Sequence, residues 1–180
     1  VDMDTSLQEV WEALGSDDAI LERKVAFKTE VSVIAARGVD GSVVCFPVAE
    51  NSHGEGILRR SVAPARISDA AAAGAVAAAE SLVRALDVVG LLAVEMFVTE
   101  DDEILINEIA PRPHNSGHWT QDGCSTSQFE QFVRAVTGLP LAPADALFET
   151  EMINLIGEDV ATVPRYLRDP SARVHLYGKD

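Results

Sequence analysis

The spacing of hydrophobic residues predicts one helix and one strand in the first quarter of the chain. Residues 5–14 place apolar side chains at helical spacing, with Thr5 or Ser6 as candidate N-cap and Gly15 at the end. Residues 30–36 alternate in the manner of a half-buried strand.

A turn signal and a change of composition predict the next elements. Asp40-Gly41 is a strong hairpin signal, and it joins the first strand to a second strand within residues 42–48. Residues 49–60 are polar and contain glycine, which indicates a functional loop that leads into an edge strand with Ile57 and Leu58.

A second hairpin is predicted after an alanine-rich helix. Ser68 is the candidate N-cap of that helix, which runs over residues 68–86. The later elements are a buried strand over 91–98, a turn at 101–102, a partner strand over 104–109, a helix over 127–136 and a strand over 151–156. Hairpins combined with helices, without regular strand–helix alternation, predict an α+β fold in which helices pack on one face of an antiparallel sheet.

The charge balance excludes two kinds of partner. The 180 residues contain 14 Lys and Arg against 29 Asp and Glu, a formal net charge of -15. Nucleic acids and anionic membrane surfaces are bound by clustered basic side chains, so neither is expected as a partner. The apolar stretches also fall short of the roughly 20 residues that a membrane-spanning helix needs.

Two cysteines, Cys45 and Cys124, are too few for a disulfide framework and have no CxxC spacing. We therefore expect a reducing, cytoplasmic location and no catalytic role for either thiol.

Two glutamates interrupt the strands of the second hairpin. With the turn centred near residues 101–102, Glu95 lies opposite Glu108, and both strands are otherwise apolar. Two carboxylates that share one buried site repel each other and need a cation such as Mg²⁺, which would in turn hold nucleotide phosphates. The alternative is that both glutamates lie on the solvent face of an exposed sheet.

A polar loop follows directly after Glu108. Residues 110–123 (APRPHNSGHWTQDG) contain Arg112 and His114, stiffening prolines and Gly117, which allows close backbone approach. Arg112 can pair with a phosphate or carboxylate through two hydrogen bonds. The alternative is an exposed turn whose histidines and tryptophan have no function.

These stretches resemble the ATP-grasp core of the N5-carboxyaminoimidazole ribonucleotide synthetase family. The resemblance rests on residues 91–98 (LLAVEMFV) and on residues 107–120 (NEIAPRPHNSGHWT), with support from residues 20–51, 53–64 and 152–157. Ala110 stands where other ATP-grasp enzymes commonly have Asn, and this departure is itself like the synthetase family.

The resemblance implies an activity with its substrates and assembly. It implies an ATP-dependent carboxylation of 5-aminoimidazole ribonucleotide by bicarbonate, through carboxyphosphate, in purine biosynthesis. The implied cofactors are ATP and Mg²⁺, or Mn²⁺ in its place, and the implied assembly is a homodimer.

The resemblance also implies site residues. Glu22 and Val25 would receive adenine, Glu30 would bind the ribose hydroxyls, and His53 would lie in the nucleotide site. Asn107, Glu108 and Glu95 would form the phosphate and metal site, with Glu95 and Glu108 as metal ligands. Arg112 and His114 would be catalytic, positioning bicarbonate and the ribonucleotide.

The resemblance further divides the chain. Residues 1–25 would close a small ATP-grasp subdomain and form a hinge, 26–157 would form the core subdomain, and 158–180 would begin a C-terminal segment. A glycine-rich phosphate loop does not precede Trp11, so we expect a part of a longer protein that binds nucleotide weakly and turns over little alone. Two other readings stay open: another ATP-grasp ligase, such as a formate-dependent glycinamide ribonucleotide transformylase, and a non-catalytic nucleotide-binding module.

Overall fold

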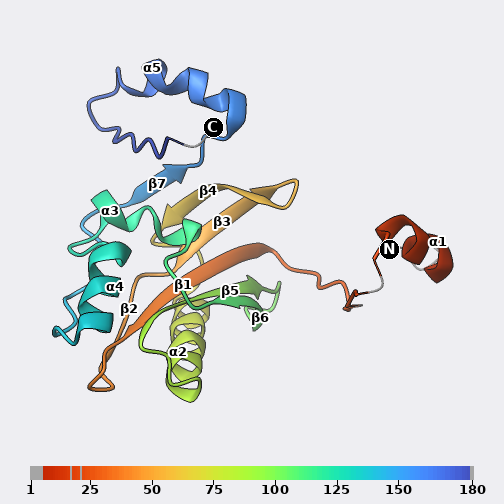
Figure 1. Ribbon diagram of the computed structural model, residues 1–180, viewed down its shortest axis with the longest axis horizontal. Helices are drawn as coiled ribbons and strands as arrows, with labels where there is room; N and C mark the ends of the chain where they lie inside the picture. Colours follow the sequence, from red (N-terminus) through yellow and green to blue (C-terminus); the bar gives the residue numbers. More distant parts are fainter. Residues whose placement is uncertain (1–5, 17, 21, 179–180) are drawn as a thin grey trace.

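A single antiparallel sheet forms the centre of the structure, a computed structural model that describes residues 6–16, 18–20 and 22–178 (Figure 1). Its strands in the described residues are β1 (Thr29–Arg37), β2 (Val43–Cys45), β3 (Ala49–Gly54), β4 (Ile57–Ala63), β5 (Gly90–Val98), β6 (Ile104–Ala110) and β7 (Thr150–Ile153). They are ordered β6-β5-β1-β3-β4-β7, and β2 pairs with the C-terminal end of β1. The helices are α1 (Leu7–Leu14), α2 (Asp69–Ala85), α3 (Thr120–Gly123), α4 (Gln128–Thr137) and α5 (Val163–Tyr166), with 3-10 turns η1 (Asn115–Gly117) and η2 (Gly157–Thr162). The predicted α+β class with an antiparallel sheet is confirmed.

Helices cover both faces of this sheet, so the expectation that they pack on one face is wrong. Alternate residues of β1 enter two separate cores: Val31 and Val33 pack with α2, whereas Ile34 and Ala36 pack with the residues around α3 and α4. The central strands β1 and β5 are nearly continuous apolar runs, and such runs require cover on both sides.

Polar residues 49–60 form most of two paired strands, β3 and β4, where a loop leading to an edge strand was expected. The reason is that the polar side chains of this hairpin are satisfied across the sheet. Ser61 donates to the Oδ1 atom of Asn51 at 2.8 Å, and the Nδ2 group of Asn51 donates to Ser32 at 2.9 Å, all three being buried. Burial of polar groups is tolerated when they bond to one another, which a count of polar residues does not reveal.

The alanine-rich helix α2 follows its predicted pattern closely. The Oγ atom of Ser68 accepts a hydrogen bond from the backbone N–H of Ala71 at 3.1 Å, confirming the predicted N-cap. Every fourth residue, from Ala71 through Ala75 and Ala79 to Val83, is buried against the sheet. Small side chains at these positions let the helix axis lie close to β1 and β5.

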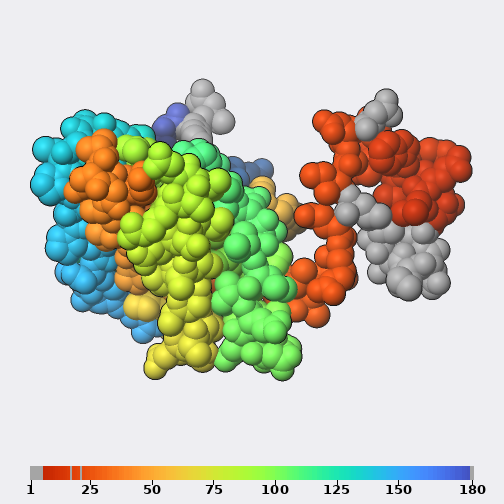
Figure 2. All heavy atoms as spheres, turned by 90° about the horizontal axis from the view of Figure 1, so that it is seen from below, coloured from red at the N-terminus to blue at the C-terminus, as the bar shows by residue number. Residues whose placement is uncertain are grey.

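Helix α1 lies away from the rest of the chain (Figures 1 and 2). None of its residues is buried, and its apolar stripe, with Leu7, Trp11 and Leu14, is exposed. Ser6 occupies the N-cap position without a side-chain capping bond, and the other candidate, Thr5, lies outside the described residues. An extended segment over residues 22–28 connects α1 to β1.

Both cysteines are free, as the sequence predicts for thiols without a catalytic role. Burial raises the pKa of Cys45 to about 11 and that of Cys124 to about 12, so neither thiol is ionised near neutral pH. No described helix is long and apolar enough to cross a membrane.

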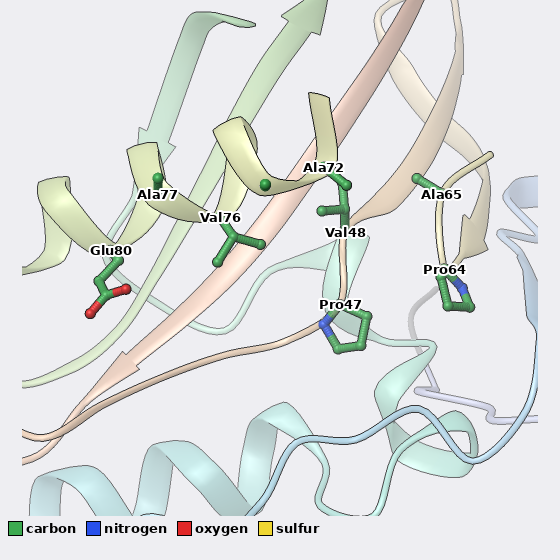
Figure 3. Close-up of a pocket in the computed structure, with 9 residues that line it drawn as sticks. Pro47, Val48, Pro64, Ala65, Ala72, Val76, Ala77 and Glu80 are labelled. Carbon is green, nitrogen blue, oxygen red and sulfur yellow. The ribbon is translucent and has the colours of Figure 1, made fainter. Parts of the chain in front are cut away.

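An apolar groove lies beside α2, between Pro47 and Pro64 on one side and Val76 on the other (Figure 3). Val48, which lines this groove, belongs to the α2 core. The groove is therefore on the α2 face of the sheet, opposite the side chains described next.

Candidate functional site

The β5–β6 hairpin brings Glu95 and Glu108 together. Glu95 pairs directly with Glu108, as predicted, but next to the turn the register differs by one residue, and Met96 pairs with Ile106. Asn107 is thus an extra residue on β6, a β-bulge at the position of the glutamate pair. Bulges redirect side chains locally, so this one sets the direction of Asn107 and Glu108 relative to the rest of the edge strand.

Three potential metal ligands converge where the hairpin meets the following loop. Ligand atoms of Glu95, Glu108 and His114 all lie within 4.8 Å of one another, and the Nδ1 atom of His114 is 3.6 Å from Oε1 of Glu95. Glu95 alternates with Leu92 and Val94 of the α2 core, so the cluster lies on the other face, beneath the loop of residues 111–123. The side chains of Glu95 and His114 are only 14% and 12% exposed, whereas Glu108 lies on the open edge.

Glu95 is held in an unfavourable electrostatic environment. Burial raises its pKa, and the nearby carboxylate of Glu108 raises it further. A divalent cation between the two glutamates would remove this penalty, and carboxylate oxygens are the donors that Mg²⁺ prefers. The donor set therefore fits the metal that the sequence predicts.

His114 is poised as a neutral imidazole. Burial lowers its pKa, and the positive charge of Arg112 lowers it further. Its Nδ1 atom accepts from the backbone N–H of Ser116 at 3.4 Å and lies 2.9 Å from the hydroxyl of Ser116. A neutral ring whose Nδ1 accepts carries its proton on Nε2, which can donate to an anionic oxygen.

Glu30 and His53 form a second group of the site, on neighbouring strands. The Nδ1 atom of His53 is paired with the carboxylate of Glu30, joining β1 to β3. The charges of Glu30 and His53 both act on the pKa of Glu95, which places the pair next to the potential metal ligands. The sequence resemblance assigned both residues to the nucleotide, and the structure brings them to the same face.

The remaining predicted residues lie further out. Arg112 is exposed at the start of the loop, where its guanidinium donates to the carbonyl of Pro113 at 3.1 Å. Glu22 is exposed and Val25 half-buried in the extended segment before β1. No contact among the described residues joins Glu22 or Val25 to the carboxylate cluster.

Gln128 is a site residue that the sequence reasoning missed. It is fully buried at the start of α4, and its Oε1 atom accepts from the backbone N–H of His114 at 2.9 Å. Its Nε2 group donates to the carbonyl of His114 at 2.7 Å and bonds Nδ1 of His118 at 2.8 Å. One side chain thereby fixes the backbone of the loop over 111–123 at His114. A glutamine on the inner face of an amphipathic helix was the available signal.

Gly117 lets the loop lie directly on the sheet. A Cβ atom there would lie 2.6 Å from Oε1 of Gln128 and 2.9 Å from Cγ1 of Ile34.

We expect Gly117→Ala to lower the free energy of unfolding by about 1–3 kcal/mol, as overpacking of a filled core does. Denaturant unfolding measures this cost. Gly56→Ala is the comparison, because it meets nothing within 4 Å but has a φ of +74°, so its loss reports backbone strain alone. A Gly117→Ala loss no larger than the Gly56→Ala loss would show that the loop does not pack as described.

Comparisons with known proteins show which family the chain resembles. The ATP-grasp domain model matches residues 1–129. The chain is similar to N5-carboxyaminoimidazole ribonucleotide synthase of Brucella melitensis, with 51% identity over 98% of this chain and 49% of that protein. It is 45% identical to the Escherichia coli synthase, over 91% of this chain and 45% of that protein.

Solved structures of the same kind show the same fold. The Thermus thermophilus synthetase matches with a TM-score of 0.88 and 47% identity, over 97% of this chain and 49% of that one. An Aspergillus clavatus synthase in complex with ADP and 5-aminoimidazole ribonucleotide matches with a TM-score of 0.83 and 37% identity, over 86% and 43%. The chain spans about half the length of these relatives. On its sequence match and its fold, the chain belongs to the ATP-grasp family.

Proposed function

We propose that the protein containing this chain carboxylates 5-aminoimidazole ribonucleotide with bicarbonate at the expense of ATP. The products are N5-carboxyaminoimidazole ribonucleotide, ADP and phosphate. The observation that carries the proposal is the cluster of Glu95, Glu108 and His114 at the root of the loop over 111–123, in a chain 51% identical to a synthase of that name.

The reaction divides into two displacements. An oxygen of bicarbonate attacks the γ-phosphorus of ATP, ADP leaves, and carboxyphosphate forms. The amine of the ribonucleotide then attacks the carboxyl carbon, or the carbon dioxide released from it, while phosphate leaves and the amine loses a proton. Both steps bring anions together, so positioning and charge neutralisation carry most of the catalysis.

The side chains of the site suit these tasks. Glu95 and Glu108 would hold Mg²⁺, which supplies neutralisation of the phosphate charge when bound, with Mn²⁺ as an alternative. Asn107, on the bulge beside Glu108, would contact the phosphates. His114, through its Nε2–H group, and Arg112 would hold bicarbonate and the ribonucleotide as donors.

The nucleoside part of ATP would lie across β1 and the segment before it. Glu30 would accept hydrogen bonds from the ribose hydroxyls, with His53 fixing its carboxylate. Glu22 and Val25, in the extended segment that leads from α1 to β1, would contact adenine. Helix α1 lies away from the rest of the structure. This supports a division at about residue 25 between a small subdomain and a core over 26–157, with 158–180 opening a C-terminal segment. We further propose a homodimer in the cytoplasm.

Substrate dependence tests the proposal on the full-length protein. We expect ADP release to require both bicarbonate and 5-aminoimidazole ribonucleotide, and the 180-residue chain alone to bind nucleotide weakly with little turnover. ADP release that instead requires formate and glycinamide ribonucleotide would assign the protein to the transformylase reaction. Nucleotide binding without turnover under either condition would indicate a non-catalytic module.

A further inference from the structure

The loop over residues 111–123 is held on two sides. On its inner side Gln128 bonds the backbone of His114, as described above. On its outer side it contacts the C-terminal segment over residues 172–178, which returns above α3 (Figure 1).

Three contacts join the C-terminal segment to the loop. Nε2 of His175 lies 2.6 Å from Oδ2 of Asp122. The Nε2 group of Gln121 donates to the hydroxyl of Tyr177 at 3.2 Å. The ring of Tyr177 packs against the ring of His118, with centroids 5.7 Å apart.

Residues 172–178 have no helix or strand of their own. Among the described residues, the other side-chain hydrogen bonds of this segment are local ones, from Arg173 to the carbonyls of Pro170 and Ala172. Side chains that bridge more than 50 residues of sequence must offset the entropy of ordering both segments, and three contacts at one place share that cost. These contacts connect the segment to the loop.

The outer contacts continue into the site through one chain of side chains. Tyr177 contacts His118, whose Nδ1 atom bonds Gln128. Because Oε1 of Gln128 accepts from the N–H of His114, the amide orientation is fixed, and its two Nε2 hydrogens serve His118 and the carbonyl of His114. A shift of His118 would disturb the residue that sets the backbone of His114.

We propose that His175 and Tyr177 are positioning residues, which hold the loop over 111–123 in the geometry that Arg112 and His114 need. The inference rests on the proposed function, because it assigns these residues to the bicarbonate and ribonucleotide end of the same site. They act through Asp122 and His118 and touch no reacting atom.

Hydrogen–deuterium exchange of the full-length protein tests the physical coupling. In a His175→Ala/Tyr177→Leu variant we expect backbone amides of residues 114–123 to exchange about tenfold faster, because local opening follows the loss of anchoring contacts. Phenylalanine keeps the ring of Tyr177 and loses only the hydroxyl. A variant with Tyr177→Phe in place of Tyr177→Leu should therefore regain most of the protection from exchange. Leu176→Ala is the matched control, since Leu176 lies between the two residues and is 68% exposed.

Kinetics test the consequence for the site. We expect the double variant to raise the KM for bicarbonate about tenfold while the KM for ATP changes less than about twofold, since misplacement of the loop affects one end of the site. His175→Ala alone should give part of this increase in the KM for bicarbonate. Asp122→Asn should give the same increase as His175→Ala, and combining these two changes should add little.

The outcomes separate this inference from the proposed function. Unchanged exchange in residues 114–123, or an equal change in Leu176→Ala, would overturn the positioning role. Equal increases in the KM values for ATP and bicarbonate, together with a lowered melting temperature, would also overturn the positioning role. They would indicate general destabilisation instead. A third outcome would refute the proposed function and leave the anchoring contacts in place. In it, the double variant exchanges faster in residues 114–123, but the wild-type protein shows no bicarbonate-dependent ADP release.

Discussion

Replacing Glu95 with Gln is expected to remove almost all turnover of the full-length protein and, at the same time, to stabilise its metal-free form. The carboxylate would be half of the metal site, so activity should fall by about 10²-fold or more. The stabilisation has the opposite origin: Glu95 is half-buried beside Glu108, and an amide has no charge to desolvate or repel.

The pH dependence gives this prediction its sign. The pKa of Glu95 in the folded protein is raised above its ordinary value of 4.5, so the folded state favours the protonated form. Below that ordinary value both states are protonated, and Glu95→Gln should change little. As the pH rises through the raised pKa, the wild-type protein loses stability that the variant keeps. We expect the melting temperature of the metal-free variant to exceed that of the wild type by about 2 °C or more above that pKa.

Two comparisons make the Glu95 experiment specific. Glu100→Gln removes an exposed carboxylate near the turn of the same hairpin and should leave activity unchanged. Glu108→Gln should abolish turnover as Glu95→Gln does, and it should lower the raised pKa of Glu95 by removing the nearby charge. Mn²⁺ binding, followed by electron paramagnetic resonance, measures metal affinity independently of turnover. Unchanged affinity in both active-site variants would exclude them as metal ligands.

Replacing Gln128 with Ala is expected to cost both stability and activity. The change leaves three buried or half-buried partners without their bonds, namely the N–H and carbonyl of His114 and Nδ1 of His118. Unsatisfied buried polar groups and the vacated volume should lower the free energy of unfolding by about 2–4 kcal/mol. The freed loop should lower kcat/KM for bicarbonate by about 10²-fold, because small misplacements of positioned groups are that costly.

The neighbouring glutamine of α4 offers a matched control. Gln131 is also fully buried, and it makes the same two kinds of bond, to the N–H and carbonyl of Ala142, at 3.0 and 2.7 Å. Gln131→Ala should therefore cost similar stability, measured by denaturant unfolding, while activity per folded molecule stays within about twofold of the wild type. Equal losses of activity in both variants would mean that Gln128 only stabilises the fold.

Local patterns predict an element well when the spacing of its apolar residues and its capping residue indicate the same boundaries. Residues 68–86 combine an N-cap serine with a continuous apolar stripe, and α2 spans nearly those residues. The turn at 101–102 predicted the β5–β6 hairpin, but next to the turn the strands pair one residue away from the expected register. Only the bulge at Asn107 brings Glu95 opposite Glu108. The prediction of a loop over residues 49–60 was wrong. The buried polar side chain of Asn51 finds hydrogen-bond partners on β1 and β4, which the sequence around it cannot indicate.

The sequence by itself determined the antiparallel pairing, the presence of Glu95 and Glu108 on one hairpin, and the resemblance that names the chemistry. It did so because turn residues, alternation and charged interruptions are local properties of the chain. Only the tertiary structure decided that helices cover both faces, that Glu30 and His53 pair beside the carboxylates, and that Gln128 and the C-terminal segment hold the loop from two sides. These contacts join residues 14 to 56 positions apart or separate faces of one sheet, and their energies depend on burial and distance, which exist only once the chain is folded.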